Sequence, residues 1–356
     1  MPSLPISVSH TVRSNVLSYF MKQYFLLCLL MATVHPSLQA QSETYAEKLG
    51  FPKDKKIIIL HVDDAGMSYE SNVGTMTAID RGIASSTSVM MPCGWVPQFF
   101  AYLKQHPNTD AGVHLTLTSE WDAYRWSPLV GREKAPGLYD EQGAFWRSVA
   151  QVVEHASADE VEAEIRAQLA RYRAFGLQPT HMDSHMGTLF QPKFLMRYVK
   201  VATDEKVPIL FPGGHASLII KANNVPPAQQ QLIQQVGQQL WNAGLPVLDD
   251  LDGTSYGWNL QTGTATADRA VTDENLQAYK TKKFKELLTS AKPGLTYIIM
   301  HCTAPTPTFD QISTSGQTRK GDMLAMLDPA LKSFIQEQGI IVTTWRELME
   351  RRRQVK

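Results

Sequence analysis

Carboxylates and imidazoles follow several short apolar or β-prone stretches of this sequence, where strands are expected to end. Asp63 and Asp64 are adjacent, and His114 and His185 close two similar stretches further along the chain. His301 follows the most apolar of these stretches. One carboxylate and two imidazoles can bind a divalent metal ion, while a second carboxylate beside them can transfer a proton. These residue types favour metal-assisted hydrolysis.

The stretches that carry these residues alternate with helix-like segments, a pattern typical of parallel βαβ units. Carboxyl ends of parallel strands meet at one face of a barrel, so the side chains should converge there. We predict an α/β fold, a distorted (β/α) barrel of seven or eight parallel strands in a single catalytic domain. A doubly wound open sheet is the alternative, but no glycine-rich phosphate loop follows the first strand. The expected strands cover residues 56–62, 83–91, 110–117, 180–184, 207–211, 246–251, 295–300 and 340–344.

Helices are expected between these strands. The clearest covers 158–175, because Ser157 and Glu160 have the spacing of a capping box and Gly176 stands just past its end. The other expected helices cover residues 73–81, 97–105, 193–203, 227–243, 275–291 and 323–338.

Each candidate residue has a structural alternative. Adjacent aspartates are common in turns and helix caps, and a histidine on an apolar strand is commonly buried without a ligand. Neighbouring residues of a strand point in different directions, so Asp63 and Asp64 are expected to do different work. His61 faces the same side as Asp63 and is expected to support it. Pro179 favours a strand and turn around His181, which is therefore not assumed to bind metal.

Composition excludes some partners and permits a full core. The chain has 356 residues, 43% of them hydrophobic, and a formal net charge of +0. No basic cluster precedes Arg351–Arg353, so a nucleic-acid partner is not expected. Cys93 and Cys302 could form one bridge, but buried free thiols are the preferred interpretation.

The first forty residues have the features of an export signal. They contain no acidic side chain, and Lys22 precedes an apolar run that is too short to span a bilayer. We expect Met21 to be the start and Ala40 to precede the cleavage point. The mature protein is then secreted or periplasmic, without stable membrane insertion; an uncleaved anchor is the alternative.

The remaining chain divides into a linker at 41–55, a barrel at 56–349 and a basic C-terminal tail at 350–356. Residues 119–155 form an aromatic insertion after the third expected strand, with Trp121 and Trp126 among its rings. Such an insertion can line a binding cleft or form a small satellite core, and both interpretations stay open.

At these motifs the sequence resembles the YdjC-type carbohydrate deacetylases, the family that contains the chitooligosaccharide deacetylases. The order and spacing of the motifs agree over most of residues 56–349. Departures concern the surroundings of the site: Ala65 stands where an aromatic residue is common, and Met186 and Gly187 replace further histidines. The matching segments are Val62–Ser68, Asn72 with Gly74, Gly82–Ser88, Gly112–Thr118, Pro179–His185, His301, Arg319 and Gly339 with Ile340.

The resemblance implies a metal-dependent hydrolase that removes acetyl groups from N-acetylated amino sugars or oligosaccharides. Carried over by position, Asp64, His114 and His185 would bind the metal. Asp63 would be the general base for the metal-activated water, and His301 would protonate the departing amine. Another ester or amide hydrolase on the same site, or a non-catalytic glycan-binding protein, are the alternatives.

One divalent metal ion is expected as cofactor. Magnesium and zinc are the foremost candidates, and manganese, cobalt, nickel and iron also suit two imidazoles and a carboxylate. Asp183 is well placed to orient an imidazole ligand, and Arg319 falls where the family has an arginine near the site. The oligomeric state is not predicted. The residues expected to support the site or contact substrate are His61, His181, Asp183, Arg319, Trp121 and Trp126.

Overall fold

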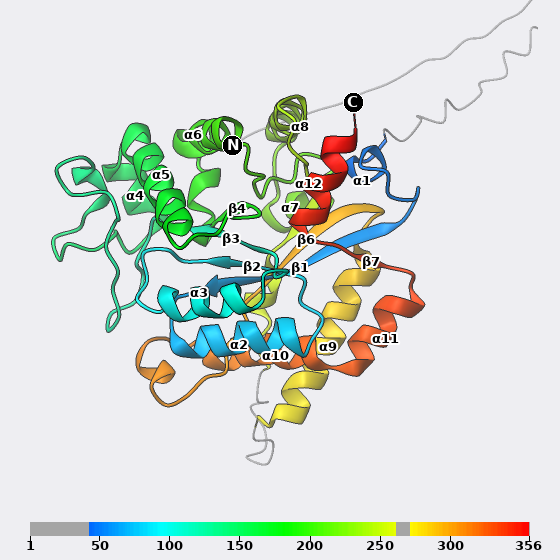
Figure 1. Cartoon of the computed structure of the whole chain (residues 1–356). Helices are drawn as coiled ribbons and strands as arrows, with labels where there is room; N and C mark the ends of the chain where they lie inside the picture. The colour runs from blue at the N-terminus through cyan, green and yellow to red at the C-terminus, as the bar shows by residue number, and fades with distance from the viewer. Residues whose placement is uncertain (1–42, 261–270, 356) are drawn as a thin grey trace, which may run out of the picture. The chain divides into compact units, whose positions relative to one another are not determined.

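The computed structural model describes residues 43–260 and 271–355, so the expected signal segment lies outside the described residues. Within them, seven strands form one all-parallel sheet (Figure 1). This confirms the predicted distorted barrel. The strands are β1 (Lys56–Ala65), β2 (Ser86–Val89), β3 (Ala111–Leu115), β4 (Met182–Ser184), β5 (Asp250–Asp252), β6 (Gly294–Met300) and β7 (Ile341–Val342).

The strand order explains the distortion. It runs β4-β3-β2-β1-β6-β5, with β7 off this path beside the start of β1, so the curled sheet has no regular ladder between its end strands β4 and β5. The expected strand 207–211 contributes only one bridge, from Ile209 to Met182. Between this segment and β5, the amides of Gly214 and Ala216 donate to the carbonyls of Leu248 and Asp249 in place of a regular ladder.

Helices cover the outside of the curved sheet. In Figure 1, α2, α9, α10 and α11 lie along one side, and α4, α5, α6 and α8 lie along the other. The capping box of Ser157 and Glu160 begins α5 as predicted. The helices are α1 (Tyr45–Lys48), α2 (Tyr69–Asp80), α3 (Val96–Gln105), α4 (Val149–His155), α5 (Ala158–Ala174), α6 (Pro192–Glu205), α7 (Ser217–Asn223), α8 (Pro227–Asn242), α9 (Asp273–Ser290), α10 (Gly316–Leu327), α11 (Pro329–Glu337) and α12 (Trp345–Gln354).

The central strand β1 is buried on both faces, which is why its sequence is a continuous apolar run. Ile58 and Leu60 belong to the core beneath α9, α10 and α11, while Ile57 and Ile59 belong to the core beneath α1 and α12. Because all four side chains are fully buried, each stabilises the fold by about 1.5–3 kcal/mol. The strand that carries the two aspartates is therefore firmly held.

Two further segments differ from the sequence prediction. The single helix expected at 323–338 is two helices, because Pro329 lacks an amide proton and Asp328, in extended geometry, caps the second one. The expected linker 41–55 contains α1, whose first amides, those of Tyr45 and Ala46, donate to the Asp249 carboxylate. Leu49 and Phe51 are buried, so the described part of this segment packs on the barrel.

The aromatic insertion 119–155 forms a satellite core continuous with the main one. Trp126 and Phe145 are buried in it, and Tyr139 pairs with Phe145 in an antiparallel bridge. Glu164 of α5 accepts hydrogen bonds from the amides of Leu129 and Val130, which fixes the insertion to the barrel. The insertion therefore presents a rigid surface beside β3.

Other sequence predictions have clear outcomes. Cys93 and Cys302 are buried free thiols, as preferred. The described basic residues of the C-terminal tail continue α12 to Gln354, and Arg352 stacks on Trp241 at 4.1 Å. No helix within residues 43–260 and 271–355 has the length and hydrophobicity to cross a membrane.

Candidate functional site

The two adjacent aspartates lie on a bulge at the end of β1. The register between β1 and β2 shifts between Val62 and Ala65, and Asp64 has a φ of 68°. Both carboxylates consequently face the same side: Nε2 of His301 lies 3.9 Å from Oδ2 of Asp63 and 3.9 Å from Oδ2 of Asp64. The expectation that they point in different directions was wrong. A bulge with a left-handed, non-glycine residue is strained and is typical of functional sites.

Asp64, His114 and His185 form one compact group, here called the outer cluster. Oδ1 of Asp64 lies 3.2 Å from Nε2 of His114 and 3.3 Å from Nδ1 of His185. The two ring nitrogens lie 3.3 Å apart. Oδ1 of Asp64 is buried and has no hydrogen-bond partner among the described residues. Oδ1 of Asp64 is therefore unsatisfied, while the two ring nitrogens that face it are within hydrogen-bond distance of each other.

These separations suit a metal ion. Bonds of about 2.0–2.1 Å in tetrahedral geometry place neighbouring ligand atoms about 3.3 Å apart. All three edges of the outer cluster have this length. The residues predicted as metal ligands therefore fit a divalent ion without rearrangement.

Two carboxylates hold the imidazoles of the outer cluster in position. Oδ1 of Asp183 lies 2.7 Å from Nδ1 of His114, and Oε1 of Glu120 lies 2.9 Å from Nε2 of His185. Each carboxylate occupies one ring nitrogen and turns the other toward Asp64, an arrangement common around metal-binding histidines. Asp183 was predicted from sequence for such a role. Glu120 was not, because it begins the aromatic insertion and no spacing links it to His185.

Arg319 of α10 supports Asp64 from the other side. Its Nη1 donates to Oδ2 of Asp64 at 2.7 Å, and its Nε donates to Oγ of Ser315. Burial alone would raise the pKa of Asp64, but the Arg319 guanidinium, together with His114 and His185, holds that pKa well below its usual range. Asp64 is therefore ionised at neutral pH, as a ligand must be.

His301 stands opposite the outer cluster, just past β6. Its backbone amide donates to Oδ2 of Asp322, and Asp322 forms a buried ion pair with Lys280 at 2.8 Å. The ring is 16% exposed and its Nδ1 has no hydrogen-bond partner among the described residues. Burial and then the charge of Arg319 lower the pKa of His301. Nε2 of the ring lies 3.9 Å from both aspartates.

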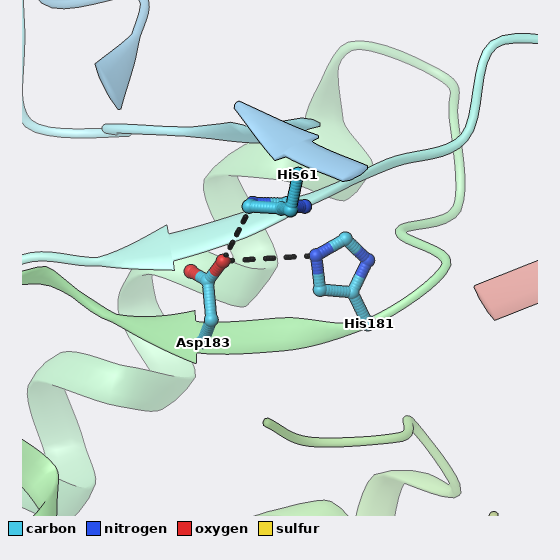
Figure 2. Close-up of side chains that lie close together, drawn as sticks. All are labelled: His61, His181 and Asp183. Atoms are coloured by element: carbon cyan, nitrogen blue, oxygen red, sulfur yellow. Dashed lines mark ion pairs between the residues drawn. The ribbon is translucent and has the colours of Figure 1, made fainter. Parts of the chain in front are cut away.

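His61, His181 and Asp183 form a second group, the inner cluster, deeper in the barrel (Figure 2). Oδ2 of Asp183 lies 3.0 Å from Nε2 of His61 and 3.7 Å from Nε2 of His181. Nε2 of His61 also lies 3.1 Å from Oδ1 of Asp63. His61 therefore lies between Asp63 and Asp183, the carboxylate that orients His114.

The inner cluster is closed by packing and hydrogen bonds. Oγ of Ser86 and Oγ of Ser88 each lie 3.0 Å from a ring nitrogen of His61, and Tyr297 donates its hydroxyl to Asp183. The His181 ring stacks on Trp345. A Cβ at Gly112 would lie 2.6 Å from that ring, so only glycine fits there.

The two tryptophans predicted near the site have different neighbours there. Trp126 is buried, donates its Nε1 proton to the carbonyl of Thr118, and meets the ring of His185 edge-on at 6.3 Å. Trp121 is partly buried between Trp126 and the Arg319 guanidinium. Trp126 thus supports His185, and Trp121 lines the site.

The chain resembles proteins of known family. It matches the YdjC-like protein family over residues 57–337. It is 30% identical over 305 residues to the carbohydrate deacetylase of Thermus thermophilus, covering 85% of this chain and 97% of that protein. It is 32% identical over 142 residues to the chitooligosaccharide deacetylase of Serratia marcescens, covering 39% of this chain and 53% of that protein.

A solved structure agrees on the fold. The crystal structure of an Enterococcus faecalis protein, described there as a candidate for cellobiose-phosphate cleavage, superposes with a TM-score of 0.64 at 21% identity. The match covers 83% of this chain and 99% of that one. The family match spans β1 to α11, and the T. thermophilus protein aligns over nearly its whole length. The chain therefore belongs to the YdjC-like protein family.

Proposed function

We propose that this protein hydrolyses the acetamide of N-acetylated amino sugars or their oligosaccharides, using one divalent metal ion. The observation that carries the proposal is the outer cluster, three donor atoms 3.2–3.3 Å apart beside Asp63 and His301. The names of the relatives from T. thermophilus and S. marcescens supply the substrate class.

The metal ion would be held by Asp64, His114 and His185. When bound, it would polarise the amide carbonyl and lower the pKa of water from about 15.7 toward about 7. Two imidazoles and one carboxylate suit zinc, and magnesium, manganese, iron, cobalt and nickel are compatible. The remaining chemistry belongs to groups of the chain itself.

Asp63 is placed to act as the general base. Its Oδ2 lies 3.9 Å from Nε2 of His114 and 3.9 Å from Nε2 of His301, between the outer cluster and the opposite wall. Its Oδ1 lies 3.1 Å from Nε2 of His61 but has no hydrogen bond among the described residues. As the bond between water oxygen and carbonyl carbon forms, Asp63 takes the water proton.

His301 is placed to act as the general acid. The pKa of His301 is lowered, so its ring takes up the proton that Asp63 has removed from water, across the 3.9 Å between Oδ2 of Asp63 and Nε2 of His301. As the carbon–nitrogen bond breaks, His301 gives this proton to the departing amine, which would otherwise be a poor leaving group. Acetate and a free amino sugar result. Tyr256 meets the His301 ring edge-on at 5.1 Å. It would therefore border the reacting sugar.

We also propose that the protein is exported. The acid-free first forty residues with their short apolar run support cleavage after Ala40. Sequencing the N-terminus of the protein recovered from the culture medium or periplasm tests this: a mature chain beginning at Gln41 is expected, and a cytoplasmic chain that keeps the segment would contradict it.

Acetate release tests the proposed function. Metal-stripped protein is incubated with N-acetylglucosamine, chitooligosaccharides, peptidoglycan fragments and O-acetylated glycans, with zinc, magnesium or manganese added back. Metal-dependent acetate from an N-acetyl sugar is expected. Acetate from O-acetyl esters alone would make the protein an esterase, and tight metal binding with no acetate from any substrate would contradict hydrolysis of acetylated sugars.

A further inference from the structure

Exposed aromatic and apolar side chains gather at the candidate site. Seven large apolar residues are exposed among the described residues, and Tyr69, Trp95, Met186 and Tyr256 are four of them. Each adjoins the site: Met186 follows His185, Tyr256 meets His301, and Tyr69 and Trp95 flank the segment after Asp64. All seven tryptophans lie in the described residues, and Trp95 alone is exposed.

Trp95 is held rigidly at this position. Its backbone amide donates to the carbonyl of Gly66 at 3.1 Å, and its carbonyl accepts from Nδ2 of Asn72 at 3.0 Å. Oδ1 of Asn72 in turn accepts from the amide of Gly66 at 2.6 Å. Gly66 is two residues from Asp64, so the same turn that follows the aspartates fixes the exposed indole.

Tyr69 completes a pair with Trp95. It is the first residue of α2, and its ring lies 5.4 Å from the Trp95 ring at 56°. The two side chains are 45% and 44% exposed. They contact each other but leave ring surface open to solvent on a rigid backbone.

Tyr124 and Trp126 link the backbone next to this pair to the outer cluster. The hydroxyl of Tyr124 donates to the carbonyl of Met67 and accepts from the amide of Gly94, the residue before Trp95. The Tyr124 ring meets Trp126 edge-on at 5.4 Å, and Trp126 meets His185. The pair therefore lies on the border of the site and not on a remote surface.

Exposed aromatic rings on a hydrogen-bonded backbone suit one ligand chemistry here. A pyranose ring presents axial C–H groups on its face, which pack on an aromatic ring while the hydroxyls stay hydrated. Tyrosine and tryptophan provide this contact at low entropic cost because they have only two side-chain torsions. A free monosaccharide with its acetamide at the outer cluster is held beside His301 and Tyr256, so a ring on the Tyr69–Trp95 pair must belong to another unit of the chain.

We propose that Tyr69 and Trp95 form a subsite for a pyranose unit neighbouring the acetylated one, so that the substrate is an oligosaccharide. The inference rests on the proposed function for the identity of the reacting sugar. The proposed ligand is a chain of β-linked N-acetylhexosamine units. Chitin-type glycans and peptidoglycan glycans both contain such chains.

Ligand binding to the metal-loaded protein tests the subsite. Titration calorimetry compares N-acetylglucosamine with chitotetraose, using Asp63→Asn in every variant to prevent turnover. Trp95→Ala is expected to weaken chitotetraose binding about tenfold, which corresponds to about 1.4 kcal/mol, and to bring its affinity close to that of the monosaccharide. Trp95→Phe should restore most of the loss, because a ring returns.

Matched variants and a second glycan complete the experiment. Tyr69→Ala should show a similar loss, whereas Met196→Ala, which removes an equally exposed side chain from α6, should bind as the parent does. A peptide-free peptidoglycan tetrasaccharide tests which glycan the subsite takes. If Trp95→Ala weakens the binding of both tetrasaccharides, the subsite recognises the face of the sugar ring; if it weakens the binding of only one, that glycan is the ligand. Equal affinities for monosaccharide and tetrasaccharide in the parent, or tetrasaccharide binding unaffected by Trp95→Ala, would overturn the subsite.

Failure of the subsite can be separated from failure of the proposed function. Trp95-dependent binding of tetrasaccharide without acetate release by protein that retains Asp63 would leave the subsite intact and contradict the deacetylase. Metal-dependent acetate release that does not respond to Trp95→Ala at any chain length would contradict the subsite alone.

Discussion

The outer cluster and the inner cluster contain the same residue types, one aspartate and two histidines, within 4.8 Å of one another. Their polar atoms have different partners. In the outer cluster, one carboxylate oxygen and two ring nitrogens face a common point, and Oδ1 of Asp64 has no hydrogen bond. In the inner cluster (Figure 2), two serine hydroxyls contact the ring nitrogens of His61 and a tyrosine hydroxyl donates to Asp183, while Trp345 stacks on His181, whose Nε2 has no hydrogen bond.

This difference shows that residue type alone does not make a metal site. Ligand atoms must face a common point, at bonding distance from one ion, without all being satisfied by the protein. The bulge of β1 creates this condition by turning Asp64 toward two imidazoles that Asp183 and Glu120 already hold from behind. The inner cluster instead fixes the orientation of the outer one. Asp183 contacts His61 with one oxygen and His114 with the other, so it links the two clusters.

The largest expected effect follows from Asp64→Asn. The change removes one ligand and its charge, so metal affinity should fall by more than about 100-fold and metal-dependent turnover should be lost. Metal content after dialysis, measured by mass spectrometry, checks this. The exposed Asp310→Asn is the matched control. Full metal content in Asp64→Asn would remove Asp64 from the ligand set.

His301→Asn should separate catalysis from metal binding. Its ring lies 3.9 Å from both aspartates and outside the outer cluster, so metal content should be unchanged. Loss of proton donation to the amine should lower kcat by about 10²–10⁴. Loss of metal in this variant would mean that His301 is a ligand and not the acid.

Asp183→Asn tests the connection between the two clusters. The amide can no longer hold the Nδ1 proton of His114 as a carboxylate does, so metal affinity should fall by about 10–100-fold although Asp183 is not a ligand. Thermal unfolding of the metal-free protein provides the control for misfolding. Unchanged affinity in a folded variant would make the inner cluster a purely structural feature.

Glu120→Gln should have a smaller effect of the same kind. The side chain is partly exposed, so water can replace some of its contact with Nε2 of His185, and a loss of about tenfold in metal affinity is expected. The neighbouring Asp122→Asn, whose carboxylate is exposed, is the control. An equal response of both variants would indicate a general charge effect.

The smallest effect concerns the pH dependence of stability through His61. Burial opposes its charged form, but Asp183 and Asp63 outweigh burial and raise the pKa of His61. Because the folded protein binds this proton more tightly than the unfolded chain, the stabilisation is full below the ordinary pKa of about 6.5 and is lost as pH rises through the raised value.

Urea unfolding of the metal-free protein and of His61→Gln over a pH series measures this contribution. The difference in unfolding free energy should be larger at about pH 5.5 than at about pH 9, on either side of the ordinary histidine pKa. A difference that grows with pH would contradict a protonated His61 between two carboxylates.

Much of the fold followed from the sequence because its signals are local. The continuous apolar run of β1, the capping box at Ser157 and the position of Pro179 depend on neighbouring residues only. The strand expected at 207–211 forms only one bridge, to Met182 of β4, because the extent of strand pairing depends on tertiary contacts and not on the local pattern. Asp328 and Pro329 did carry a local signal for a helix boundary, which the apolar periodicity of 323–338 obscured.

The convergence of Asp63, Asp64, His114, His185 and His301 could be predicted because strand ends of a parallel barrel share one face. The bulge at Asp64 could not, since nothing in the pair of aspartates indicates a left-handed backbone. Glu120 was missed for a related reason. Its contact with His185 depends on how the insertion folds back, which is a tertiary effect.

Anomalous diffraction from crystals grown with zinc tests the central claim most directly. The account predicts one strong peak at about 2.0–2.2 Å from Oδ1 of Asp64, Nε2 of His114 and Nδ1 of His185, and none among His61, His181 and Asp183. A peak in the inner cluster, or an outer cluster that stays empty in zinc-saturated crystals, would contradict it.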